Sequence, residues 1–137
     1  MTGEVVRASD VATVSAARLC ESVESGHSDH GASSRIASAL GITQEPYRID
    51  SQCKYAALAM GKAEVYLRLP TRPGYCEKIW DHAAGKLVVE EAGGVVTDVR
   101  GMALDFGKGR TLAADGGVVA SNGKFHGEVV SAVGGVI

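Results

Sequence analysis

The chain has 137 residues, of which 45% are hydrophobic and 22% are charged, so one globular domain with an ordinary core is predicted. Its 14 Lys and Arg and its 16 Asp and Glu leave a formal net charge of −2, which gives no general electrostatic attraction to nucleic acid or to an anionic membrane. No apolar run approaches the roughly 18 residues of a membrane-spanning helix, and the first ten residues lack the apolar core of a signal peptide. We therefore expect a soluble cytoplasmic protein.

Alternating strand and helix patterns follow a polar, alanine-bearing lead-in over residues 1–16. Strands that alternate with helices predict an α/β fold with a parallel or mixed sheet. In chain order we predict a strand in 18–24, a helix over 30–41, a strand over 46–50, a helix from 51 that Gly61 ends, a strand over 64–70, a helix over 77–94, strands over 94–99 and 117–121, and a helix over 125–135.

The cysteines are odd in number and lack the C-x-x-C spacing of metal sites. We expect Cys20, Cys53 and Cys76 to be reduced, buried thiols, and we expect no structural zinc site.

The stretch "EKIWDHAAGKLVVEEAGG", residues 77–94, raises a question about its aspartate. We predict that Asp81 lies in the first turn of this helix, near free backbone N–H groups and the positive end of the helix dipole. Asp81 could stabilise the helix end, or it could bind a metal beside a phosphate. Spacing alone favours the first role. The predicted apolar stripe consists of Ile79, Trp80, Ala83, Ala84, Leu87 and Val88, with Lys78, His82, Lys86 and Glu90 on other faces.

Several motifs resemble those of one enzyme family. "EKIWDHAAG", "EEAGGVVTD" and "LDFGKGRTL" resemble the C-terminal signature of the inositol-monophosphatase superfamily of magnesium-dependent phosphatases. "ESVESGHSDH", "DSQCKY" and "EVYLRLP" resemble the 3′(2′),5′-bisphosphate nucleotidases within it, which hydrolyse 3′-phosphoadenosine 5′-phosphate to AMP and phosphate. These motifs occur in the order found in the family, from Cys20 to Asn122.

The resemblance implies that residues 17–137 form the C-terminal domain of such an enzyme, with a mixed, mainly parallel sheet of about five strands and flanking helices. Family members carry, in a preceding domain, a glutamate and an Asp-Pro-Ile-Asp-Gly-Thr type segment that complete the magnesium site, and no such segment occurs here. The resemblance implies that Asp81 is the one magnesium ligand that this chain contributes. One carboxylate does not make a magnesium site, so we expect no catalytic residue in this chain and no activity from it alone.

The resemblance also implies the residues that bind the nucleotide. Ser51 and Lys54 would contact it, although an ordinary helix cap at Asp50 or Ser51 and a solvated lysine are the alternative interpretation. Arg68 would hold the second phosphate, although a strand arginine can also simply point outward.

Histidines and paired carboxylates offer further candidates. His27 would lie against the adenosine end by resemblance, with His30 as the alternative. We expect His82 to support packing and His126 to lie at the surface, whereas the adjacent Glu90 and Glu91 point about 100° apart on a helix and do not form an acid and base pair.

Two other functions remain open from the sequence. The chain could be a non-catalytic nucleotide-binding module, or part of a phosphatase for inositol phosphates. "DSQCKY" and "HSDH" argue against the second alternative. If the chain is part of a longer phosphatase, the surface that the preceding domain normally covers would be exposed here. We therefore expect self-association through this surface.

Overall fold

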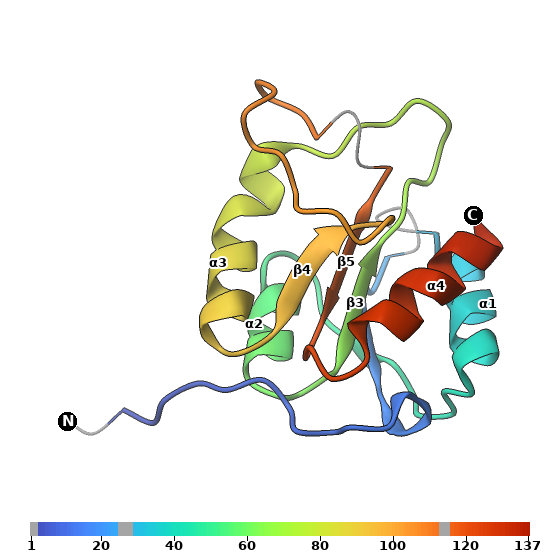
Figure 1. Ribbon diagram of the computed structural model, residues 1–137, viewed down its shortest axis with the longest axis vertical. Coiled ribbons are helices and arrows are strands. Elements are labelled where there is room, and N and C mark those ends of the chain that lie inside the picture. Colours follow the sequence, from blue (N-terminus) through green and yellow to red (C-terminus); the bar gives the residue numbers. More distant parts are fainter. Residues whose placement is uncertain (1–2, 25–28, 113–115) are drawn as a thin grey trace.

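A five-stranded sheet lies between two layers of helices in the computed structural model, which describes residues 3–24, 29–112 and 116–137 (Figure 1). The elements are β1 (Leu19–Glu21), α1 (His30–Leu40), β2 (Tyr47–Arg48), α2 (Cys53–Ala59), β3 (Val65–Arg68), α3 (Ala83–Glu91), β4 (Val95–Asp98), β5 (Val118–Ser121) and α4 (His126–Val136), with short 3-10 helices at Val14–Ala16 and Ile79–Asp81. No helix among the described residues is long and apolar enough to span a membrane.

The sheet has the strand order β2-β1-β3-β5-β4. The pairs β1–β2 and β1–β3 are parallel, whereas β3–β5 and β4–β5 are antiparallel. Four strands therefore run in one direction and β5 runs against them, which confirms the predicted α/β fold with a mixed sheet.

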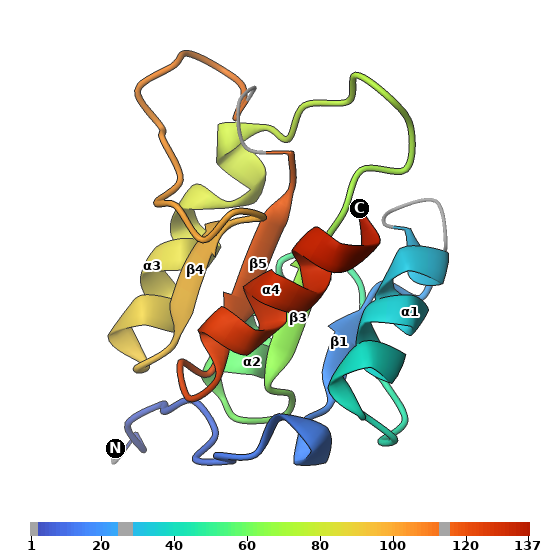
Figure 2. The same ribbon diagram turned by 45° about the vertical axis from the view of Figure 1, so that its right-hand side comes forward.

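The four helices divide into one pair on each face of the sheet. Helices α1 and α4 pack against each other on one face, and α2 and α3 pack against each other on the other (Figure 2). Strand β3 shows the alternation that supports both layers: Val65 and Leu67 join the core beneath α1 and α4, while Tyr66 joins the core beneath α2 and α3.

Contact between α2 and α3 requires a glycine. Gly85 of α3 lies against the ring of Tyr55 in α2, so a Cβ atom at position 85 would stand 2.2 Å from Tyr55 Cδ2. This distance is far below van der Waals contact. The two helices can approach this closely only because residue 85 has no side chain.

The predicted helix over 77–94 is wrong in its first third and in its buried face. A 3-10 helix ends at Asp81, His82 adopts φ −131°, and α3 begins only at Ala83. The break coincides with the imidazole of His82, which is buried and hydrogen-bonded at both ring nitrogens. His82, Gly85 and Val89 face the core. Most of the predicted apolar stripe is exposed, namely Trp80, Ala83, Ala84, Leu87 and Val88.

Hydrogen bonds to backbone groups of the lead-in attach it to the domain. The side-chain amide of Asn122 donates to the carbonyl oxygens of Ser9 and Val11, at 3.0 and 2.8 Å. Ala8 N–H also donates to Ala92 O at the end of α3. This segment therefore runs along the lower end of the sheet and of α3 (Figure 1).

All three cysteines are free thiols, but they are not equally buried. Cys20 lies in the core, where burial raises the pKa of its thiol to about 12. Cys76 is partly exposed and Cys53 is exposed, so the prediction of buried thiols is wrong for Cys53.

Candidate functional site

Four of the five predicted site residues line one pocket of about 320 Å³. Ser51, Lys54, Arg68 and Asp81 meet there although they come from three different parts of the fold. The predicted His27 lies outside the described residues. The complete lining is Asp50, Ser51, Gln52, Lys54, Tyr66, Arg68, Asp81 and His82.

The pocket lies at the carboxyl ends of parallel strands. Arg68 is the last residue of β3, and Asp50 and Ser51 follow β2 closely. Strand β1 lies between these two strands, so the chain crosses over β1 between β2 and β3. Such a switch in strand order leaves a crevice where ligands bind in open α/β sheets.

Ser51 has an unusual backbone conformation. Its φ of 65° makes it the one non-glycine residue with positive φ in the described parts of the chain. Helix α2 begins at Cys53 with Gln52 at the N-cap, and Ser51 Oγ accepts only a long 3.4 Å hydrogen bond from Cys53 N. Asp50 does not cap the helix, because its carboxylate accepts from Val23 N at 2.9 Å. Ser51 therefore lies in a strained turn, and its side chain lines the pocket instead of capping α2.

Lys54 is buried, contrary to the alternative of a solvated lysine. Its residue surface is 3% exposed, and it forms no ion pair with a carboxylate within residues 3–24, 29–112 and 116–137. The ammonium lies 5.6 Å from the centre of the Tyr66 ring. Burial, and next the positive charge of Arg68, lowers the pKa of Lys54. A buried cation beside a second cation favours a bound anion.

Arg68 does not point freely outward. Its side chain is 20% exposed, and its Nε lies 3.1 Å from Glu77 Oε1. The carboxylate holds the guanidinium at the pocket wall, beside the hydroxyls of Tyr66 and Tyr75.

Behind the pocket, a buried hydrogen-bond chain joins α2 to the Asp81 turn. Tyr55 Oη and His82 Nδ1 share a hydrogen bond at 2.6 Å, and His82 Nε2 donates to Glu77 Oε1 at 2.8 Å. Because a carboxylate oxygen only accepts, the His82 ring carries a proton on Nε2. His82 therefore supports packing, as predicted, and it does so immediately beside Asp81.

Asp81 occupies the exposed side of that turn. Its carbonyl oxygen accepts a 2.8 Å hydrogen bond from Gln52 Nε2, which ties the Asp81 turn to the start of α2. Because Asp81 precedes α3 by two residues, it is not in the first turn of the α-helix as predicted. Among the described residues, no three His, Cys, Asp or Glu side chains lie together as a metal site. At this turn Asp81 offers a single carboxylate.

The remaining candidates lie elsewhere. His30 begins α1 and lines a separate pocket with Glu21 and Arg48. His126 is not a plain surface residue, because its ring is half-buried and hydrogen-bonded to Thr97 and Ser121, both at 2.8 Å. On α3, Glu90 forms a local ion pair with Lys86.

Sequence reasoning missed two residues that hold the site together. Gln52 links the start of α2 to Asp81, and it lies within the quoted motif "DSQCKY". Glu77 fixes Arg68 and His82, and it opens the quoted motif "EKIWDHAAG". Motif membership was the available signal, but the partners of these side chains become visible only in three dimensions.

Comparison with known protein families shows to which family the chain belongs. The model of the inositol monophosphatase family matches residues 1–137. The chain belongs to this family. Proteins of the family are generally metal-dependent.

Two curated relatives of this chain carry the same name. A 3′(2′),5′-bisphosphate nucleotidase of Emericella nidulans is 54% identical over 123 residues, which cover 90% of this chain and 35% of the relative. The protein of the same name from Schizosaccharomyces pombe is 50% identical over 131 residues, covering 96% of this chain and 37% of the relative. The chain thus spans about a third of the length of these relatives.

Solved structures share the fold. Inositol monophosphatase from Anabaena superposes with a TM-score of 0.72 at 25% identity, covering 96% of this chain and 48% of that protein. A Thermotoga maritima inositol monophosphatase gives a TM-score of 0.71 at 25% identity, covering 98% of this chain and 46% of that protein.

Proposed function

We propose that this chain is the nucleotide-recognising part of a magnesium-dependent 3′(2′),5′-bisphosphate nucleotidase, which hydrolyses 3′-phosphoadenosine 5′-phosphate to AMP and phosphate. The observation that carries the proposal is the meeting of Ser51, Lys54, Arg68 and Asp81 in one pocket. The shared name of relatives at 50 and 54% identity supports the same substrate.

The two cations in the pocket suit a ligand with two phosphate groups. Lys54 and Arg68 supply two cations, and the hydroxyl of Ser51 adds a hydrogen-bonding group. Since burial and Arg68 both disfavour the charged form of Lys54, an anion beside it would relieve an unfavourable state of the free protein. Binding energy would therefore come chiefly from phosphate recognition.

Magnesium would be held only in part by this chain. Asp81 would be one of its oxygen ligands, and the metal would supply charge neutralisation at the phosphate and activation of water. The other ligands would come from the region that the longer relatives possess and this chain does not span. Ser51, Lys54 and Arg68 would position the nucleotide and would not change charge during the reaction. The isolated chain should accordingly bind the nucleotide without hydrolysing it.

Calorimetric titration of the chain with 3′-phosphoadenosine 5′-phosphate, without magnesium, tests recognition. Lys54→Met should weaken binding about tenfold or more, the scale of one lost charge-assisted hydrogen bond. Lys62→Met is the matched control, because Lys62 lies outside the pocket. Equal binding by Lys54→Met and wild type would contradict the proposal. Inositol 1-phosphate, titrated in parallel, tests the alternative substrate class.

Catalysis can be tested by grafting residues 17–137 into the full-length Emericella nidulans relative. If Asp81 only stabilised the start of the turn, Asp81→Asn would cost roughly 0.3–1 kcal/mol of stability and leave turnover nearly intact. If Asp81 ligates magnesium, turnover should fall by about two orders of magnitude or more. Lys54→Ala and Arg68→Ala should raise KM more than they lower kcat. Near-normal turnover of Asp81→Asn at low magnesium would end the metal-ligand assignment.

A further inference from the structure

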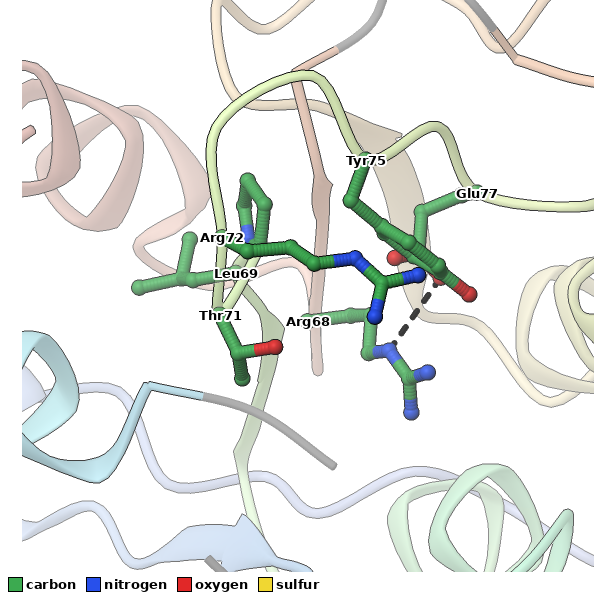
Figure 3. A pocket seen from close by; sticks show the side chains of 7 residues that line it. Arg68, Leu69, Thr71, Arg72, Tyr75 and Glu77 are labelled. Carbon is green, nitrogen blue, oxygen red and sulfur yellow. Dashed lines mark ion pairs between the residues drawn. The ribbon is translucent and has the colours of Figure 1, made fainter. Parts of the chain in front are cut away.

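A second pocket, of about 220 Å³, lies on the other side of Arg68 (Figure 3). Its polar lining comes from Arg68, Thr71, Arg72, Tyr75 and Glu77, most of which belong to the loop after β3. Asp81 and Lys54 do not line it. Only Arg68 is common to the two pockets.

Glu77 gives this pocket an unusual requirement. Its side chain is 3% exposed, and Oε1 already accepts from both Arg68 and His82. Oε2 is buried and has no hydrogen-bond partner within residues 3–24, 29–112 and 116–137. A buried carboxylate oxygen without a donor is costly. A ligand that suits the pocket should therefore donate a hydrogen bond to Glu77 Oε2.

The opposite side of the pocket offers hydrogen-bond donors. The guanidinium of Arg72 lies 5.2 Å from the centre of the Tyr75 ring, and Arg72 forms no ion pair with any described carboxylate. Figure 3 shows Arg72 and Tyr75 directed toward the Glu77 carboxylate, with Arg68 beneath them and the Thr71 hydroxyl on the same side. Two guanidinium groups beside one hydroxyl match the oxygens of a small anion.

We propose that this pocket binds hydrogen phosphate, the protonated inorganic phosphate ion. Its P–O–H group would donate to Glu77 Oε2, and its remaining oxygens would accept from Arg68 and Arg72. Near neutral pH, inorganic phosphate keeps at least one proton, whereas sulfate of similar size and geometry keeps none. Glu77 would therefore accept hydrogen phosphate and repel sulfate.

The same requirement separates free phosphate from a phosphate group on a nucleotide. Phosphate monoesters lose their second proton at a pKa of about 6, so at neutral pH they mostly lack the donor that Glu77 Oε2 needs. The site is thus specific for the free ion. Phosphate binding here does not depend on the proposed function, but in a working nucleotidase it would retain the released product beside the pocket that holds the nucleotide.

Titration of the full chain with inorganic phosphate and, separately, with sodium sulfate tests this proposal, with backbone amide shifts of residues 68–77 as the readout. Phosphate should bind at least about tenfold more tightly than sulfate. AMP should shift these amides less than phosphate does. Equal affinities for phosphate and sulfate, or an AMP response as strong as that of phosphate, would overturn the proposal.

Variants locate the ion and reverse the preference. Glu77→Gln keeps the carbonyl acceptor for Arg68 and His82 but offers an N–H group instead of Oε2, so sulfate should become the preferred ion. Arg72→Ala should weaken phosphate binding about tenfold or more. Arg35→Ala, which changes an exposed residue of α1, should leave phosphate binding unchanged. Arg72 is exposed, so this variant tests the site even if Glu77→Gln fails to fold. Unchanged phosphate binding in Arg72→Ala would overturn the proposal.

Lys54→Met separates the two pockets. This variant should retain phosphate binding, since Lys54 does not line the second pocket, although it should lose the nucleotide if the proposed function is correct. Loss of phosphate together with the nucleotide would place the ion in the first pocket and overturn the further inference alone.

Discussion

The two helical layers bury similar cores but present different outer surfaces. Outer positions of α1 and α4 carry small or polar residues such as Ser34, Arg35, Glu128 and Ser131. The outer surface of α2 and α3 is apolar: Val5, Val6, Met60, Leu87 and Val88 line a groove of about 540 Å³ there. Leu87 is 60% exposed. A helix that is apolar on both faces is typical of an interior layer.

This difference explains why the amphipathic pattern of residues 77–94 is misleading. The exposed stripe with Leu87 and Val88 is the more apolar face, so the pattern predicts that it faces the core. The face that does contact the sheet carries His82, Gly85 and Val89, which pack by shape and hydrogen bonding. The α2 and α3 layer is therefore held tightly on its inner side and exposes apolar surface on its outer side.

The largest effect is expected where α2 and α3 meet. Gly85→Ala should lower the free energy of unfolding by about 3 kcal/mol or more, because the new methyl group would overlap the Tyr55 ring. Gly134→Ala in α4 is the matched control, since a Cβ atom at position 134 would have no neighbour within 4 Å among the described residues. That change should stabilise the protein by up to about 1 kcal/mol through helix propensity. Urea denaturation of both variants measures the contrast, and equal effects would contradict it.

Removal of one hydroxyl should have an intermediate effect. Tyr55→Phe leaves buried His82 Nδ1 without its hydrogen-bond partner, so a loss of about 1–3 kcal/mol of stability is expected. Tyr47→Phe in β2 should change stability by less than about 0.5 kcal/mol, because the structure gives its hydroxyl no hydrogen bond among the described residues. Thermal unfolding followed by circular dichroism compares them. A harmless Tyr55→Phe would show that the Tyr55, His82 and Glu77 chain does not hold the Asp81 turn.

The exposed groove should make the chain self-associate. Leu87→Lys should weaken association about tenfold or more, since burial of one leucine contributes about 1.5–3 kcal/mol. Ser131→Lys adds the same charge to the outer surface of α4 and should leave association unchanged. Sedimentation velocity over a concentration series gives the measurement. A strictly monomeric wild-type chain at high concentration would refute the expectation.

The smallest effect concerns pH and the α4 layer. Burial lowers the pKa of His126, whose ring bonds to the hydroxyls of Thr97 and Ser121. The unfolded chain therefore takes up a proton near pH 6.5 that the folded protein resists, so stability should fall as pH drops below about 6.5. In His126→Gln this part of the acid loss should disappear. Parallel denaturation curves at neutral and mildly acidic pH provide the comparison.

The elements that local sequence signals define were predicted well. Helix α1 spans His30–Leu40 within the predicted range, because Asp29 caps its start and Gly41, with φ of 71°, ends it. The break at His82 could not be predicted in the same way. It depends on hydrogen bonds to Tyr55, 27 residues earlier in the chain, and to Glu77.

The candidate site shows a different limit of sequence reasoning. The residues alone left a solvated Lys54 and an outward-facing Arg68 open as alternatives, and only the family resemblance indicated that both bind substrate. The structure buries Lys54 and pairs Arg68 with Glu77. Burial of a charged side chain depends on how β3 and α2 pack, which local periodicity does not encode.

The burial of Lys54 also links ligand supply to the lifetime of the fold. A buried ammonium that forms no ion pair with a described carboxylate destabilises the protein that contains it, so Lys54→Met should yield a domain that is more stable but no longer binds its ligand. A bound anion would remove the same penalty and add to the free energy of unfolding in proportion to the logarithm of its concentration. Proteolysis in the cell acts on the unfolded fraction, so the abundance of this domain should rise and fall with the concentration of its ligand.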